Sequence, residues 1–270
     1  MHPKSAIQMD KTKYRSNNRW NMVLPREHGS WGFVLEPLFI ALIIGFTWDG
    51  FLLGISAVLA FLAHQPMLNA LNAGQKYKSF ALTLAATLSI LALAGLSVFM
   101  AQSNIVTVIP LIVALSVMVV YFFLEILGFD RKLYTRMIGA SAMGLVAMSI
   151  LLAAGWQLPL ALGVLAVILS RAISTTIYIR ARLQLQKGNN AYVKPSHWTH
   201  ALILPVMVIL AVNQLIPWLA ALAVTILCIR AYGGLSRFRQ KLTVKRIGMY
   251  EFVYGMQLVI LTVAGYIAGL

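Results

Sequence analysis

Long apolar segments alternate with short polar connections along most of the chain. A helix needs about 20 apolar residues to cross a bilayer, and about nine segments approach that length. They are residues 30–48, 50–72, 79–101, 105–127, 135–154, 158–182, 198–213, 215–231 and 249–268. The stretch from His197 to Ile229 is too long for one crossing. Asn213 and Gln214, ahead of Pro217, supply a turn within it. The pattern predicts an all-α membrane protein, a polytopic bundle of about nine transmembrane helices.

The composition agrees with this prediction, since 60% of the residues are hydrophobic and only 11% are charged. Soluble domains carry about a quarter charged residues, so a soluble protein is excluded. In a soluble protein the net charge of +15 would suggest nucleic-acid binding. Here the basic residues lie in short connections between spans, where they face anionic lipid headgroups. We therefore expect membrane lipids as partners and no nucleic acid.

The 22 lysines and arginines fall in the N-terminal segment and in alternate connections between the spans. The opposite connections, around Asp49, Ser103, Trp156 and Asn213, have none. The positive-inside rule then places the N-terminus in the cytoplasm and the C-terminus outside, in a multi-pass protein of the bacterial inner (plasma) membrane. We expect residues 1–24 to form a basic cytoplasmic tail and residues 25–270 a single transmembrane helical domain.

Polar residues inside the predicted spans concentrate in their cytoplasmic halves. Such residues are costly in a membrane, and they mark functional sites or hydrogen bonds between helices. The second and sixth spans each carry a stripe at the spacing of one helix face: Gln65, Asn69, Asn72 and Lys76, and Arg171, Thr175, Tyr178 and Arg182. We expect the two stripes to face each other across a shared cavity.

Glu36 is the deepest carboxylate of the first span, and Pro37 weakens the helix beside it. Because its neighbours are apolar, its carboxyl group must be protonated or paired with an arginine or histidine of another helix. Glu27 and His28 lie near the start of the same span. These three residues, Glu36, Glu27 and His28, are the candidate catalytic acids and bases.

Further polar residues at the same depth are candidates for binding a substrate. They are Asn69, Asn72, Arg136, Arg171, Tyr178, Arg182, His200 and Glu251. Arginine is well suited to grip a phosphate or carboxylate. The first functional hypothesis is therefore a cytoplasm-facing polar cavity that binds or acts on an amphiphilic, isoprenoid- or lipid-like anion. Its apolar body would lie among the helices.

Two segments carry a resemblance to a known family. LPREHGSWGFVLEPL, residues 24–38, and IYIRARLQLQKGNNAYVKPSHWTHA, residues 177–201, resemble the two signature segments of the YwiC-like family of bacterial membrane proteins. The corresponding residues are Pro25, His28, Gly29, Trp31, Tyr178, Arg180 and His200. This resemblance implies a membrane-protein family and no particular reaction.

A more distant, architectural likeness is to intramembrane prenyltransferases of the UbiA type. Those enzymes carry two Asp-rich motifs at the cytoplasmic ends of the second and sixth spans, which bind Mg²⁺ and a diphosphate. The corresponding stripes of this chain hold no aspartate, although Mg²⁺ prefers carboxylate oxygens. The likeness thus implies a UbiA-like transferase without the Mg²⁺ motifs, and the sequence identifies no cofactor.

Two other classes of function remain open. A secondary transporter of a small anion or metabolite needs a site near the midplane beside a broken helix, and the Glu36-Pro37 pair fits that description. A haem- or metal-binding membrane protein could use the histidines His28, His64, His197 and His200. An enzyme, a carrier and a transporter all fit the one-sided polar pattern.

Overall fold

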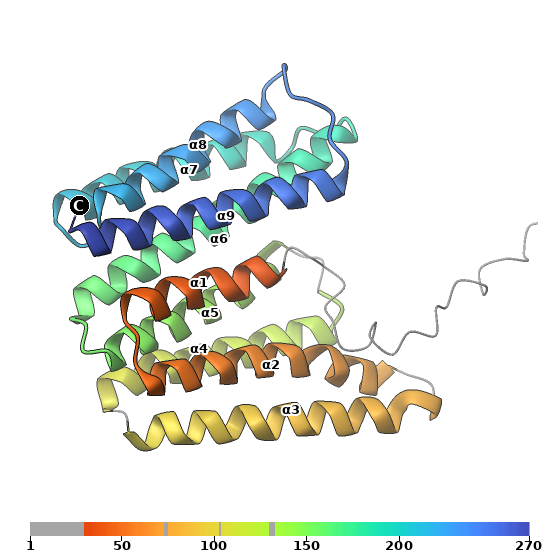
Figure 1. Cartoon of the computed structure of the whole chain (residues 1–270). Helices are drawn as coiled ribbons and strands as arrows, with labels where there is room; N and C mark the ends of the chain where they lie inside the picture. The colour runs from red at the N-terminus through yellow and green to blue at the C-terminus, as the bar shows by residue number, and fades with distance from the viewer. Residues whose placement is uncertain (1–29, 73–74, 103, 130–132, 270) are drawn as a thin grey trace, which may run out of the picture.

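The computed structural model describes residues 30–72, 75–102, 104–129 and 133–269. These residues form nine α-helices and no strand (Figure 1). The helices are α1 (Ser30–Ile44), α2 (Trp48–Asn72), α3 (Gln75–Gln102), α4 (Ile105–Ile126), α5 (Leu133–Ala153), α6 (Leu158–Gln186), α7 (Val193–Val212), α8 (Trp218–Leu235) and α9 (Val244–Ala268). The predicted all-α fold is confirmed.

Eight of the described helices, α2 to α9, are long and apolar enough to cross a membrane. The shorter α1 is apolar from Trp31 to Ile44. The predicted division between the seventh and eighth spans is confirmed, because α7 and α8 are separate helices. At the turn between them, Gln214 has a φ of 58° and the Asn213 side chain donates a hydrogen bond to the Ile209 carbonyl.

Two helices join the two sides of the bundle. In Figure 1, α1 and α5 lie between a group formed by α2, α3 and α4 and a group formed by α6 to α9. The contacts agree, because α5 packs against both α4 and α6, and α1 packs against both α5 and α9. Ile40 of α1, Ile150 of α5 and Val164 of α6 are fully buried where these helices meet. Apolar packing of α1 and α5 therefore sets how the two groups are placed.

Connections with and without basic residues lie at opposite ends of the bundle. Lys187, between α6 and α7, and Arg237, between α8 and α9, lie at the end where α1 begins, on the right of Figure 1. The C-terminus lies at the other end, together with the described connections at residues 45–47, 154–157 and 213–217, which hold no lysine or arginine. The positive-inside rule assigns the basic end to the cytoplasm.

Cysteine labelling tests this orientation. The one native cysteine, Cys228, is buried, so Cys228→Ser provides the background. We expect Asn213→Cys to react with a membrane-impermeant maleimide added to intact cells, because residue 213 is exposed at the end without basic residues. Lys187→Cys should react only after the cells are opened. The reverse labelling pattern would contradict the orientation.

Candidate functional site

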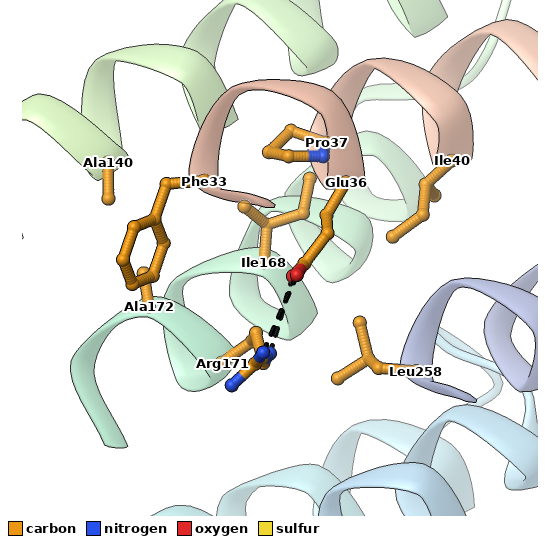
Figure 2. Close-up of a pocket in the computed structure, with 9 residues that line it drawn as sticks. All are labelled: Phe33, Glu36, Pro37, Ile40, Ala140, Ile168, Arg171, Ala172 and Leu258. Carbon is orange, nitrogen blue, oxygen red and sulfur yellow. Dashed lines mark hydrogen bonds and ion pairs between the residues drawn. The ribbon is translucent and has the colours of Figure 1, made fainter. Parts of the chain in front are cut away.

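A buried network of ion pairs is centred on Arg171, in the middle part of α6. The guanidinium of Arg171 donates from Nε to Oε2 of Glu36 at 3.3 Å and from Nη2 to Oε1 at 3.4 Å. Figure 2 shows the carboxylate of Glu36 pointing from α1 toward this guanidinium. Both side chains are almost completely buried. Of the two alternatives that the sequence left open for Glu36, protonation or a cationic partner, the structure shows a partner, Arg171.

Arg171 also binds α9 and its own helix. Its Nη1 donates to Oε2 of Glu251 at 3.2 Å, and its Nη2 donates to the Glu251 carbonyl at 2.7 Å. The hydroxyl of Thr175, one helical turn further along α6, accepts another bond from Nη1. Each nitrogen of this guanidinium therefore has an acceptor.

Arg230 of α8 is the second cation of the network. Its Nη1 lies 2.5 Å from Oε2 of Glu251, so Glu251 binds both arginines. The guanidinium carbon lies 4.2 Å from the ring centroid of Tyr178 and 5.2 Å from that of Tyr254. Cation–π attraction therefore adds to the ion pair in positioning Arg230.

The hydrogen bonding of Arg230 is incomplete. The side chain is only 4% exposed, yet its Nε and Nη2 groups have no hydrogen-bond partner among the described residues. Buried N–H groups without partners are costly, and each one in a native structure calls for an explanation. His200 of α7 lies within electrostatic reach of Arg230. Its Nδ1 meets the Ser196 carbonyl at 2.8 Å, while its buried Nε2 also lacks a described partner.

At Gly255, α9 comes close to Glu36 of α1 and Arg171 of α6, and this close approach makes the network possible. A Cβ atom placed on this glycine would overlap the carboxylate of Glu36 and come within 3.0 Å of Nη2 of Arg171. Gly255 thus leaves the space in which the ion pair between α1 and α6 forms.

A small cavity borders the Glu36–Arg171 pair. Its volume is about 10 Å³, enough for a single water molecule. Apart from the two charged residues its lining is apolar, and Figure 2 shows Phe33, Ile168 and Leu258 around it. A cavity of this size holds no part of a larger ligand, so it is not the predicted substrate cavity, which stays a prediction.

Arg182 lies one turn beyond Tyr178 on α6 and is also buried. Its Nη1 donates to the Gly234 carbonyl, and its Nη2 donates to the Gln240 carbonyl at 2.5 Å. Arg182 therefore connects α6 to the end of α8 and to the connection that follows it. Neutral carbonyl acceptors leave its positive charge uncompensated by any described carboxylate.

A second, half-buried pair lies in the other group of helices. Nε2 of His64, on α2, is 2.6 Å from Oε2 of Glu125, on α4. The imidazole also packs against the rings of Tyr121 and Phe122, with centroids 5.5 and 6.0 Å away. This pair connects α2 to α4 and shares no described contact with the Arg171 network.

The structure brings some of the predicted site residues together and not others. Glu36, Arg171, Tyr178 and Glu251 meet in one network, and Arg182 and His200 lie at its edges. Arg136 does not join them, because it is exposed on α5. Glu27 and His28 lie outside the described residues, as do the side chains of Asn69 and Asn72.

The expected cavity between the stripes of the second and sixth spans stays a prediction, because the side chains of Asn69, Asn72 and Lys76 lie outside the described residues. The described part of α2 packs mainly against α3 and α5, whereas α6 packs against α5, α7 and α8. The polar face of α6 meets α1, α8 and α9 through Arg171 and Tyr178. The spacing of the α6 stripe correctly predicted one buried helix face, but it carried no information about which helices that face would meet.

Sequence reasoning missed Arg230, which was counted only among the basic residues of a connection. A signal was available, because Arg230 follows Cys228 and Ile229 and lies within the apolar stretch of α8. Leu235 ends this helix five residues later. An arginine inside an apolar stretch is more costly than one in a connection, and this cost marks it as a candidate.

Among the described residues there is no group of three or more His, Cys, Asp or Glu side chains able to hold a metal ion. His64 lies in the α2–α4 pair, while His197 and His200 are on α7. His197 stacks on Tyr232, with ring centroids 4.4 Å apart. The described histidines therefore do not form the common site that the metal hypothesis requires.

Taken together, the apolar helices and the buried network define a polytopic α-helical membrane protein with an ion-pair cluster shared by α1, α6, α8 and α9. The model of the family described as YwiC-like protein matches residues 24–151, so this part of the chain is similar to that family. The match includes the first of the two recognised segments and ends before the second. Comparisons with curated proteins and with solved structures find no match. The likeness to UbiA-type enzymes stays a prediction.

A pair of glycine substitutions on α9 tests the packing of the network. Alanine at Gly255 would displace the Glu36 carboxylate, whereas a Cβ at Gly248 meets nothing within 4 Å. Glycine to alanine in a helix otherwise favours folding by up to about 1 kcal/mol. We expect Gly255→Ala to be less stable than Gly248→Ala by about 1–3 kcal/mol, from the loss of charge-assisted hydrogen bonds. Denaturant unfolding in detergent micelles measures the difference, and equal stability would contradict the close contact.

Proposed function

We propose that this protein binds an amphiphilic anion, with the anionic head on Arg230 and the apolar chain along the lipid-facing side of α7 and α8. The observation that carries the proposal is the pair of buried N–H groups on Arg230 that lack a partner among the described residues. Hydrogen bonds from a charged group to an anion contribute about 1.5–3 kcal/mol, so an anionic oxygen would satisfy them well.

A second group near Arg230, His200, can add to the binding of an anionic head. The buried Nε2 of His200 also lacks a described partner. Because Nδ1 donates to the Ser196 carbonyl, Nε2 donates to an anion only when the imidazole is protonated.

The surroundings favour an amphiphile over a small anion. Arg230 lies about 8 Å from the end of α8 at the basic end of the bundle, counting about 1.5 Å per residue. Its neighbour Ile229 is 67% exposed, so the lipid-facing side of α8 begins one residue away. In a membrane this side chain faces lipid chains, so a ligand with its head at Arg230 can keep its chain in apolar surroundings. Such a binding site is compatible with an enzyme and with a carrier.

Binding of decane-1-sulfonate to the protein in dodecyl maltoside micelles tests the proposal. We expect Arg230→Gln to weaken binding at least about tenfold in calorimetric titration, equivalent to about 1.4 kcal/mol. The matched control is Arg237→Gln, which removes the same charge from an exposed position at the same end of the bundle. It should change the affinity by no more than about twofold.

Two further probes separate the possible ligands. Decyltrimethylammonium has a similar chain with the opposite charge and should not bind at this site. Methanesulfonate has the same head without the chain and should bind much more weakly than decane-1-sulfonate. Equal affinity for the two sulfonates would favour the small-anion transporter, and equal weakening by Arg230→Gln and Arg237→Gln would contradict a head site at Arg230.

A further inference from the structure

The charges of the buried network cancel. Arg171 and Arg230 are paired with Glu36 and Glu251, and the described ion pairs bring in no other charged side chain. Adding an anion at Arg230 would leave this cluster with an uncompensated negative charge in surroundings of low dielectric constant. Buried unpaired charge is strongly unfavourable, and a titratable group then changes its protonation state instead.

We propose that the protein takes up one proton with each anion that it binds, and that Glu36 is the group that receives it. This inference rests on the proposed function, because it needs an anion at Arg230. The proton comes from the solvent and bonds to a carboxylate oxygen of Glu36. The cluster then holds two arginines, one carboxylate and the bound anion, so its charge again sums to zero.

The geometry distinguishes Glu36 from Glu251. Glu251 contacts Arg230 at 2.5 Å and Arg171 at 3.2 Å, so its protonation would weaken two ion pairs. Glu36 has only Arg171, through contacts of 3.3 and 3.4 Å. If Glu36 is neutralised, Arg171 keeps the carboxylate and carbonyl of Glu251 and the hydroxyl of Thr175. Protonation of Glu36 therefore weakens fewer ion pairs of the network than protonation of Glu251 would.

The surroundings of Glu36 on every side are consistent with this role. Arg171 faces it from α6, Glu251 from α9 and Arg230 from α8. The helices α2 and α5 also pack against α1.

A water-sized cavity gives the carboxylate contact with a proton carrier. The cavity of about 10 Å³ is bordered by Glu36 and Arg171, and one water molecule fits a volume of that size. Phe33 and Pro37 also line the cavity. Because proline has no N–H, the Phe33 carbonyl lacks its usual helical donor and is a third potential partner for such a water.

Proton uptake during sulfonate binding tests the inference. Decane-1-sulfonate stays ionised at all working pH values, so any proton taken up must go to the protein. Calorimetric titration in two buffers with different ionisation enthalpies measures this uptake. We expect about one proton for each bound sulfonate in the wild type. The association constant should fall about tenfold for each unit of pH increase, wherever Glu36 is ionised in the free protein.

The variant Glu36→Gln removes the proposed acceptor and leaves the cluster with one uncompensated positive charge. Its proton uptake should fall to nearly zero, and its association constant should become independent of pH and exceed that of the wild type at high pH. The matched control is Glu125→Gln, which neutralises the other carboxylate paired within the bundle, next to His64. This control should keep an uptake of about one proton.

The outcomes separate the two proposals. Sulfonate binding without proton uptake in the wild type overturns this inference and leaves the proposed function standing. Uptake that persists in Glu36→Gln overturns the assignment to Glu36. Absence of sulfonate binding in the wild type refutes both. If Glu36→Gln does not fold, infrared difference spectra of the wild type decide, because a protonated-carboxyl band must appear when the sulfonate binds.

Discussion

The arrangement of α1, α6 and α9 depends on the burial of the Arg171 guanidinium. Arginine stays charged in proteins, and an unpaired charge inside a membrane is strongly unfavourable. The five acceptor contacts of Arg171 come from α1, from α9 and from its own helix. These contacts hold three helices in one register. The absence of a side chain at Gly255 is part of the same constraint, because the carboxylate of Glu36 occupies that space.

The network that satisfies Arg171 is uneven. Glu251 is bound from two sides, Glu36 from one, and Arg230 uses a single nitrogen for hydrogen bonding among the described residues. The Arg171–Glu251 contacts at the centre of the network are therefore the most constrained, and Glu36 and Arg230 at its two ends are the least constrained. Changes in ligand or proton occupancy at Arg230 or Glu36 would therefore leave the central Arg171–Glu251 contacts in place. The aromatic rings of Tyr178 and Tyr254 keep the Arg230 guanidinium in position independently of its hydrogen bonds.

The charged side chains inside the two groups of helices are paired separately, each within its own part of the bundle. The described part of the α2–α4 group contains the His64–Glu125 pair beside aromatic rings, whereas the α6–α9 group contains Arg171, Arg230 and Glu251 of the four-residue network. Between them, α1 and α5 supply mostly apolar contacts, with Glu36 as the one charged residue that α1 contributes to the described network.

The sequence by itself determined the helices, their approximate limits and the alternation of basic and neutral connections. These features depend on local apolar length and on charge, which are properties of consecutive residues. It also determined that Glu36 had to be either protonated or paired with a cation, because a buried, unpaired carboxylate is strongly unfavourable. Only the tertiary structure decided that the partner was Arg171 and not the exposed Arg136. It likewise decided that Arg230, counted as a connection charge, belonged to the network. Such choices depend on which helix faces meet across the bundle, and helical spacing places a residue on a face without specifying what packs against it.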